Sequence, residues 1–305
     1  MGARSNCRTV SLEYPIAYLP RIRSYYAALG YGAPYQWARI EDVPFQPLTK
    51  PINQCRIALV TTAAPYQPDK GDQGPGAPYN AAAKFYRVYV GETATDPDLR
   101  ISHVAIDRQH TTAEDQNTYF PLPALRRAVS AGRVGAITSQ FFGLPTNRSQ
   151  RTTIEVDCVD LIARVKADAA DAAILVANCP VCHQSVSLAA LALEAAGITT
   201  VIMGCAKDIV EHIGVPRLLF SDFPLGNAAG RPGDLASQDL TLSLALDLLE
   251  QATAARSTLA SPLQWNGNHS WKRDYCNIDI LSPEEITRRR AAFETDKRIA
   301  SDLRG

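Results

Sequence analysis

The stretch AAILVANCPVCHQSVSLAALALEAAGITTVIMGC, residues 172–205, contains a complete strand–helix–strand unit. Apolar residues run almost continuously through 172–178 and 199–204, a pattern typical of strands that are buried on both faces. The segment between them, 185–197, has the length of a helix and stops at a glycine. Two buried strands joined by a helix predict a right-handed βαβ unit in a parallel sheet.

The same alternation extends in both directions from this unit. Further strands are predicted at 55–63, 136–142 and 216–221, and further helices at 122–135, 152–170, 206–214 and 235–253. We therefore expect an α/β fold whose mostly parallel sheet is flanked by helices, as in Rossmann-like or flavodoxin-like proteins, with an irregular N-terminal region. The expected organisation is an N-terminal extension at 1–54, a catalytic domain at 55–255 and a C-terminal tail and helix at 256–305. The catalytic domain is either one unit or two lobes, 55–150 and 151–255.

Composition narrows the classes of partner. The 31 basic residues balance the 31 acidic ones, so nothing indicates a nucleic-acid-binding protein, which usually carries a basic surplus. No apolar run approaches the roughly 18 residues that would span a membrane. The first residues show no uninterrupted apolar segment of the secretory type. We expect a cytoplasmic protein that forms a homo-oligomer and acts on a small molecule.

Cysteines are the most informative residues of the chain. There are seven, an odd number, and without an export signal a disulfide framework is not expected. Cys179 and Cys205 each follow a predicted strand directly, and Cys182 lies three residues beyond the first of them. Because sites in parallel sheets lie at the carboxyl ends of the strands, these thiols are expected at one crevice.

The motif Cys-Pro-Val-Cys-His at 179–183 allows several interpretations. It matches the haem attachment pattern, but covalent haem attachment takes place in exported proteins. A structural zinc site needs four ligands, and no second cysteine pair stands at a suitable spacing. A thioredoxin motif lies near the start of a small domain, whereas this one lies past the middle of a large chain. The remaining alternative is that the two cysteines have no function and are simply buried in the core.

A reactive thiol is the interpretation that we favour. Pro180 suits the first helical position, which places Cys179 near the N-cap and Cys182 in the first turn. The positive end of the helix and its free N–H groups then favour a thiolate, and the second thiol can resolve an adduct. His183 could add positive charge, cap the backbone or face solvent.

Several blocks of the chain together resemble a known family. They are CRIALVTTA (55–63), RISH (100–103), YFPLPALRRAVSAGRVGAI (119–137), the long block 159–204 that contains the motif, and IVEHIGVPRLLFSDFPLGNAAGRPGD (209–234). In this order they resemble the glycine/sarcosine/betaine reductase component B and D-proline reductase family, over roughly residues 50–255.

The resemblance implies roles for three residues. Cys179 falls on the position of the family's selenocysteine, Cys182 on a following cysteine, and Ser185 where a further cysteine occurs. The chain would thus be a cysteine-containing homologue of selenoprotein B type. The family cleaves a C–N bond next to a carboxylate, in some members with a pyruvoyl group on a partner subunit. We expect no resident cofactor and no zinc here, and a thioredoxin-like dithiol or a second reductase subunit as partner.

Three functional hypotheses follow. In the first, Cys179 attacks a small carboxylate-bearing substrate and Cys182 resolves the adduct. In the second, Cys179 and Cys205 act as acid and base in a racemase, isomerase or lyase, although such paired thiols lie about a domain apart in aspartate/glutamate racemases and only 26 residues apart here. In the third, the chain is a non-catalytic subunit that holds a metal or a thiol.

Other candidate residues come from the loops. His103 opens a polar loop and is expected either in the site, as base or substrate ligand, or as a solvated loop histidine. Lys207 could bind a carboxylate, but a surface lysine is the plainer interpretation. The expected substrate-binding residues are Asn178, His183, Ser185, Asp107, Asn117 and Gly226.

Overall fold

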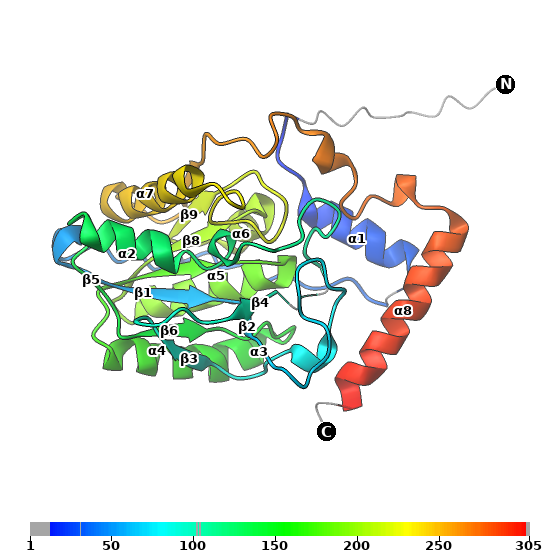
Figure 1. Ribbon diagram of the computed structural model, residues 1–305, viewed down its shortest axis with the longest axis horizontal. Coiled ribbons are helices and arrows are strands. Elements are labelled where there is room, and N and C mark those ends of the chain that lie inside the picture. Colours follow the sequence, from blue (N-terminus) through cyan, green and yellow to red (C-terminus); the bar gives the residue numbers. More distant parts are fainter. Residues whose placement is uncertain (1–12, 31, 102, 104, 303–305) are drawn as a thin grey trace.

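The central sheet confirms the predicted α/β fold (Figure 1). A computed structural model describes residues 13–30, 32–101, 103 and 105–302. Its main sheet has the order β10-β9-β8-β7-β1-β6-β3, with β5 also pairing with β1. All of these pairings are parallel except the one between β6 and the edge strand β3. A small second sheet pairs β2 with β4 in antiparallel orientation.

Strands and helices alternate along the chain as expected. The strands are β1 (Arg56–Thr61), β2 (Ala64–Pro65), β3 (Tyr89–Glu92), β4 (Leu99–Arg100), β5 (Ala136–Ile137), β6 (Gln140–Gly143), β7 (Ala172–Val176), β8 (Thr199–Gly204), β9 (Arg217–Phe220) and β10 (Ser257–Ala260). The helices are α1 (Tyr18–Ala28), α2 (Leu122–Ser130), α3 (Gln150–Thr152), α4 (Cys158–Ala167), α5 (Pro180–Ala195), α6 (Lys207–Ile213), α7 (Leu235–Gln251) and α8 (Pro283–Asp302).

The middle of the sheet forms the core. All residues of β7 and β8 are buried, and their apolar side chains pack against helices on both faces. On one face α5 contacts α4 and α6, and on the other α7 contacts α2 as well as β8 and β9. Figure 1 shows α2 and α7 on the opposite side of the sheet from α4. This burial explains why both strands are apolar throughout instead of alternating.

Local signals set the limits of α5. Cys179 is its N-cap and Pro180 its first residue. Proline fits this position because the backbone N–H that it lacks would have no partner within the helix. At the other end Gly197 has a φ of 89°, and the N–H of Ile198 donates to the carbonyl of Leu193 at 3.0 Å. Glycine closes the helix because this left-handed conformation strains other residues.

Several predicted elements differ in their bounds. The helix expected at 185–197 begins five residues earlier, and the strand expected at 136–142 is divided into β5 and β6. The helix expected at 152–170 contains a π-helical turn, Thr153–Asp157, before α4. β10 extends the sheet beyond residue 255. The short strands in the long loop after β1 were not predicted, because their sequences contain too few apolar residues to indicate strands.

The strand order creates a switch point between β1 and β7. The chain leaves β1 toward α2 on one face of the sheet, whereas it leaves β7 directly into α5 on the opposite face. Adjacent strands whose connections diverge in this way leave a crevice at their carboxyl ends. The Cys-Pro-Val-Cys-His motif follows β7 and therefore borders this crevice.

Among the described residues, no helix combines the length and the apolar character that crossing a membrane requires.

Candidate active site

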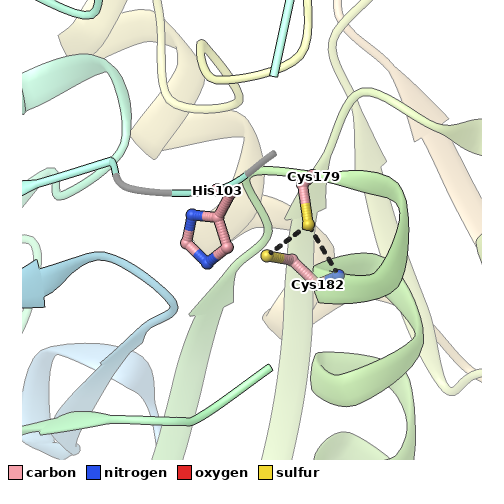
Figure 2. Close-up of side chains that lie close together, drawn as sticks. All are labelled: His103, Cys179 and Cys182. Atoms are coloured by element: carbon pink, nitrogen blue, oxygen red, sulfur yellow. Dashed lines mark hydrogen bonds between the residues drawn. The ribbon is translucent and has the colours of Figure 1, made fainter. Parts of the chain in front are cut away.

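The two cysteines of the motif face each other at the start of α5. Their Sγ atoms are 3.0 Å apart, and the Sγ of Cys179 also accepts a hydrogen bond from the backbone N–H of Cys182 at 3.4 Å (Figure 2). A disulfide would bring the sulfurs to about 2.05 Å, so these are two free cysteines in contact. Cys179 is 4% exposed and Cys182 is fully buried. The two buried sulfur atoms are therefore in direct contact.

A threonine and a histidine complete the surroundings of the second thiol. Thr146, which follows β6, lies with its Oγ1 atom 3.2 Å from the Sγ of Cys182. The same Oγ1 lies 3.2 Å from Nε2 of His103. In Figure 2 the imidazole of His103 lies beside the two sulfur atoms. The four side chains form a hydrogen-bonded chain that runs from the loop histidine through Thr146 and Cys182 to Cys179.

The environment distinguishes the two thiols. Burial raises the pKa of Cys179 well above its ordinary value, and the hydrogen bond and charge of Cys182 raise it further. Burial also opposes ionisation of Cys182, but the hydrogen bond from Cys179, the charge and hydrogen bond of His103 and the contact with Thr146 together bring the pKa of Cys182 well below the ordinary value. These directions favour ionisation of Cys182 over that of Cys179, whereas the sequence led us to expect the thiolate at Cys179.

His183 connects the ends of two neighbouring strands. Its Nδ1–H donates to the carbonyl oxygen of Cys179 at 2.8 Å, while Nε2 accepts from the backbone N–H groups of Cys205 and Ala206 at 2.9 and 3.0 Å. Burial lowers the pKa of His183 to about 4, so the ring is neutral. Of the roles left open by the sequence, His183 caps the backbone and neither carries positive charge nor faces solvent.

Gly204 makes room for this histidine. A Cβ atom at Gly204 would lie 2.9 Å from Cδ2 and 3.0 Å from Nε2 of His183, which is closer than packed atoms approach. The neighbouring Cys205 is buried, and burial raises the pKa of its thiol. Among the described residues, the close group of cysteine and histidine ligand atoms does not include Cys205.

Two buried polar atoms near the thiols have no hydrogen-bond partner among the described residues. Asn178 donates through Nδ2 to Oγ1 of Thr62 at 2.9 Å, and this contact joins the carboxyl ends of β7 and β1. Its Oδ1 accepts nothing, and neither does the Oγ of Ser185 one helical turn beyond Cys182. Unsatisfied buried polar atoms are costly, and such atoms in a native fold commonly await a ligand or water.

The remaining predicted residues lie in two loops that pack together. Both carboxylate oxygens of Asp107 lie 3.0 Å from Nδ1 of His110, and its backbone N–H donates to the carbonyl of Leu225. The carbonyl of Gly226 accepts from the hydroxyl of Thr118 at 3.2 Å. Asn117 lies in the 3₁₀ turn Gln116–Thr118, where its N–H bonds to the side chain of Asp115. Their observed contacts are within and between these loops.

Three of the site residues could together hold a metal ion. One ligand atom each from His103, Cys179 and Cys182 lies within 4.8 Å of the other two. Two thiolates and an imidazole suit a thiophilic ion such as zinc, with one coordination position left open. A structural zinc site would need a fourth protein ligand.

Thr146 was missed at the sequence level. It is part of LPTN, a few residues after the strand that is β6, so its position at the carboxyl end of a strand was visible. A lone threonine, however, carries no chemical signature, and only the adjacency of β6 to β1 and β7 brings it to Cys182.

Comparisons with known proteins find two similar reductase subunits. The chain is 27% identical to the D-proline reductase subunit gamma of Acetoanaerobium sticklandii over 221 residues. The aligned residues make up 72% of this chain and 88% of that protein. It is 22% identical over 209 residues to the glycine reductase complex component B subunit gamma of Symbiobacterium thermophilum, covering 67% of this chain and 48% of that protein. The chain thus spans about half the length of the second relative.

No protein-family model and no solved structure matches the chain. The two curated relatives agree with the family that the sequence blocks indicate, at modest identity. This chain is therefore similar to subunits of multi-component reductases.

Proposed function

We propose that this protein is a thiol-dependent reductase in which Cys179 and Cys182 supply two electrons to a small carboxylate-bearing substrate. The contact of 3.0 Å between the two sulfur atoms, at the N-terminus of α5 and at the switch point of the sheet, carries this proposal. Two thiols in contact can pass from dithiol to disulfide through a single covalent adduct. The similarity to subunits of two reductases supports the same class of reaction.

The reaction would proceed in two displacements. As the sulfur of Cys179 attacks the carbon that bears the protonated amine, Cys179 gives its proton to the thiolate of Cys182. The C–S bond forms as the C–N bond breaks, and the neutral amine leaves with the electron pair of that bond. Cys182 then loses its proton and attacks the Sγ of Cys179. The S–S bond forms as the C–S bond breaks, and the carbon keeps the electron pair and takes a proton. The substrate is reduced by two electrons and the dithiol is oxidised to a disulfide.

The surrounding residues have supporting roles in this scheme. Thr146 and His103 hold the charge of Cys182, which lets it act as proton acceptor for Cys179. The unsatisfied Oδ1 of Asn178 is suited to accept a hydrogen bond from the substrate's nitrogen. An external dithiol, such as a thioredoxin-like protein, or a second reductase subunit would restore the pair for the next turnover.

The experiment uses the two substrates in the names of the relatives, D-proline and glycine, and protein that is reduced with dithiothreitol, which is removed before the substrate is added. Single-turnover reaction of the reduced protein should produce an intramolecular disulfide that intact mass and peptide mapping locate at 179–182. Cys182→Ser should stop at a covalent adduct on Cys179 that forms more slowly, because the thiolate that accepts the proton of Cys179 is lost, and Cys179→Ser should abolish both the adduct and the disulfide. Cys158→Ser is the matched control, because Cys158 is a buried core thiol whose pKa burial raises to about 12.

A broader measurement does not depend on the substrate. Alkylation by iodoacetamide, mapped across pH, should label the motif well before Cys158. If Cys179 and Cys182 react no faster than Cys158, the proposal is wrong. If Cys205→Ser abolishes turnover while Cys182→Ser keeps it, a non-redox acid–base mechanism through Cys179 and Cys205 replaces it.

A second candidate function is metal holding. It is favoured by the single observation that His103, Cys179 and Cys182 bring three ligand atoms within 4.8 Å. Titration of the reduced protein with Co²⁺ should then give thiolate charge-transfer and tetrahedral d–d bands at one equivalent, both lost in Cys182→Ser. A protein that shows these bands but no turnover-dependent disulfide is a metal-holding subunit and not a reductase.

A further inference from the structure

The segment that carries Thr146 is held in place by side chains. Among the described residues, the backbone of residues 146–148 makes no hydrogen bond to another main-chain group. Asn147 is anchored through its Nδ2 atom, which donates to Oδ2 of Asp157 at 2.6 Å. The contact between Thr146 and Cys182 therefore depends on which other side chains fix this segment against α5.

Tyr35, from the segment between α1 and β1, contacts both the Thr146 segment and α5. Its hydroxyl donates to the carbonyl oxygen of Arg148 at 3.2 Å and accepts a hydrogen bond from Nε2 of Gln184. Gln184 is buried and lies two residues after Cys182 in α5. The guanidinium of Arg148 also lies over the Tyr35 ring, 5.3 Å from its centre. One hydroxyl group thus joins the helix that carries Cys182 to the segment that carries Thr146.

Two further hydrogen bonds fix residues 35–38 at this position. Oε1 of Gln184 accepts from the backbone N–H of Ala38 at 2.8 Å, so both ends of this amide group bond to the N-terminal region. The side chain of Gln150 donates to the carbonyl oxygen of Gln36 at 2.7 Å. Residues 35–38 are therefore tied to α5 on one side and to the segment that follows β6 on the other.

The position of Thr146 affects the chemistry of the dithiol. Its Oγ1 atom lies 3.2 Å from the Sγ of Cys182 and 3.2 Å from Nε2 of His103. A hydroxyl group forms a stronger hydrogen bond to a charged thiolate than to an uncharged disulfide sulfur, which is a weak acceptor. The contact therefore stabilises the reduced pair, in which Cys182 can be charged, more than it stabilises the disulfide.

We propose that Tyr35 is a positioning residue, which holds the segment after β6 against α5 and so keeps the hydroxyl of Thr146 on the sulfur of Cys182. Tyr35 acts through Thr146 and needs no contact with the substrate or with the reacting sulfur atoms. Loss of its hydroxyl should make the dithiol easier to oxidise. The inference rests on the proposed function, in which Cys182 accepts the proton of Cys179 and then resolves the adduct.

The test measures the redox equilibrium of the pair with glutathione. As the disulfide forms at 179–182, one molecule of oxidised glutathione is reduced to two molecules of reduced glutathione. Samples at constant pH are quenched with acid, and the remaining thiols are alkylated after unfolding, so burial does not affect their labelling. Peptide mapping then gives the oxidised fraction. Tyr35→Phe keeps the ring and loses the hydroxyl, and it should shift the equilibrium toward the disulfide by about fivefold, the effect of one hydrogen bond.

A double-mutant cycle shows whether Tyr35 acts through Thr146. Thr146→Val should shift the equilibrium in the same direction, and Tyr35→Phe should add no further shift in the Thr146→Val protein. Tyr25→Phe is the matched control and should have no effect, because the hydroxyl of Tyr25 accepts a hydrogen bond from Arg289 on α8. Thermal unfolding confirms that each variant is folded. The proposal is overturned if Tyr35→Phe has no effect, has the same effect in both backgrounds, or is matched by Tyr25→Phe.

The single-turnover assay separates this inference from the proposed function. If the substrate-dependent disulfide forms at 179–182 but the glutathione equilibrium does not respond to Tyr35→Phe, the positioning role is wrong and the reductase mechanism stands. If the cycle gives the expected result but neither D-proline nor glycine produces a disulfide, Tyr35 positions Thr146 beside a dithiol that does not reduce these substrates.

Discussion

Acidification should destabilise this protein through His183, whose environment permits only the neutral ring. The Nε2 atom accepts from two backbone N–H groups, so a proton placed there would face two donors. Nδ1 is occupied as the donor to the carbonyl of Cys179. Burial lowers the pKa of His183 from 6.5 to about 4 in the folded protein. In the unfolded chain the pKa returns to its ordinary value of about 6.5.

The sign and magnitude follow from proton linkage. Above pH 6.5 the ring is neutral in both states and has no effect on the pH dependence. As the pH falls through 6.5 the unfolded chain takes up the proton first, so the free energy of unfolding decreases until the folded ring titrates at about 4. A pKa difference of about 2.5 corresponds to roughly 3 kcal/mol, which is a large share of the stability of a typical domain.

Urea unfolding at half-unit pH steps from 7.5 to 4 gives the total pH dependence of the free energy of unfolding, to which half-buried carboxyls such as Asp208 also contribute. The contribution of His183 is the difference between the parent and His183→Gln, and it should grow between pH 6.5 and 4. His212→Gln, at an exposed position, should leave the curve unchanged. Imidazole NMR resonances report the ring directly. A His183 that titrates near 6.5, or a difference curve that is flat below that pH, would refute the reasoning.

Two substitutions probe residues around the site, and a third probes a buried ion pair between the end of α5 and the start of β9. Thr146→Val removes the hydroxyl contact with Cys182, so the midpoint of its alkylation–pH profile should rise by about one pH unit, and a midpoint that does not move contradicts the contact. Gly204→Ala places a Cβ against the buried imidazole at 2.9 Å and should cost about 1–3 kcal/mol in urea unfolding; a neutral effect would show that the ring can shift. Arg217→Met leaves Glu194, its partner at 2.7 Å, buried without the guanidinium, and should cost about 3–5 kcal/mol, whereas Glu194→Gln combined with Arg217→Met should recover part of that loss.

Much of the fold was predictable because its signals are local. The apolar strands at 172–178 and 199–204, the proline at the first position of α5 and the glycine after it each act over a few residues. The element bounds were less predictable where tertiary contacts decide them. β10 has little apolar character of its own and exists because β9 offers it a free edge.

The candidate site was likewise predictable only in part. That Cys179 caps a helix and that Cys182 follows in the first turn could be derived from the sequence by itself, because both facts are properties of one short segment. Which thiol carries the charge could not, because Thr146 and His103 come from other parts of the chain and the parallel sheet brings them to Cys182.

His183 shows most directly what the sequence could not decide. The sequence left it as a source of charge, a cap or a solvent-facing side chain, and its chemistry as an imidazole allows all three. Tertiary structure selected the cap, because the start of α5 places the ring against the end of β8, where two backbone N–H groups need an acceptor. The sequence by itself determined that a dithiol stands at a helix N-terminus, and the packing of neighbouring strand ends decided which side chains surround it and which thiol they favour for ionisation.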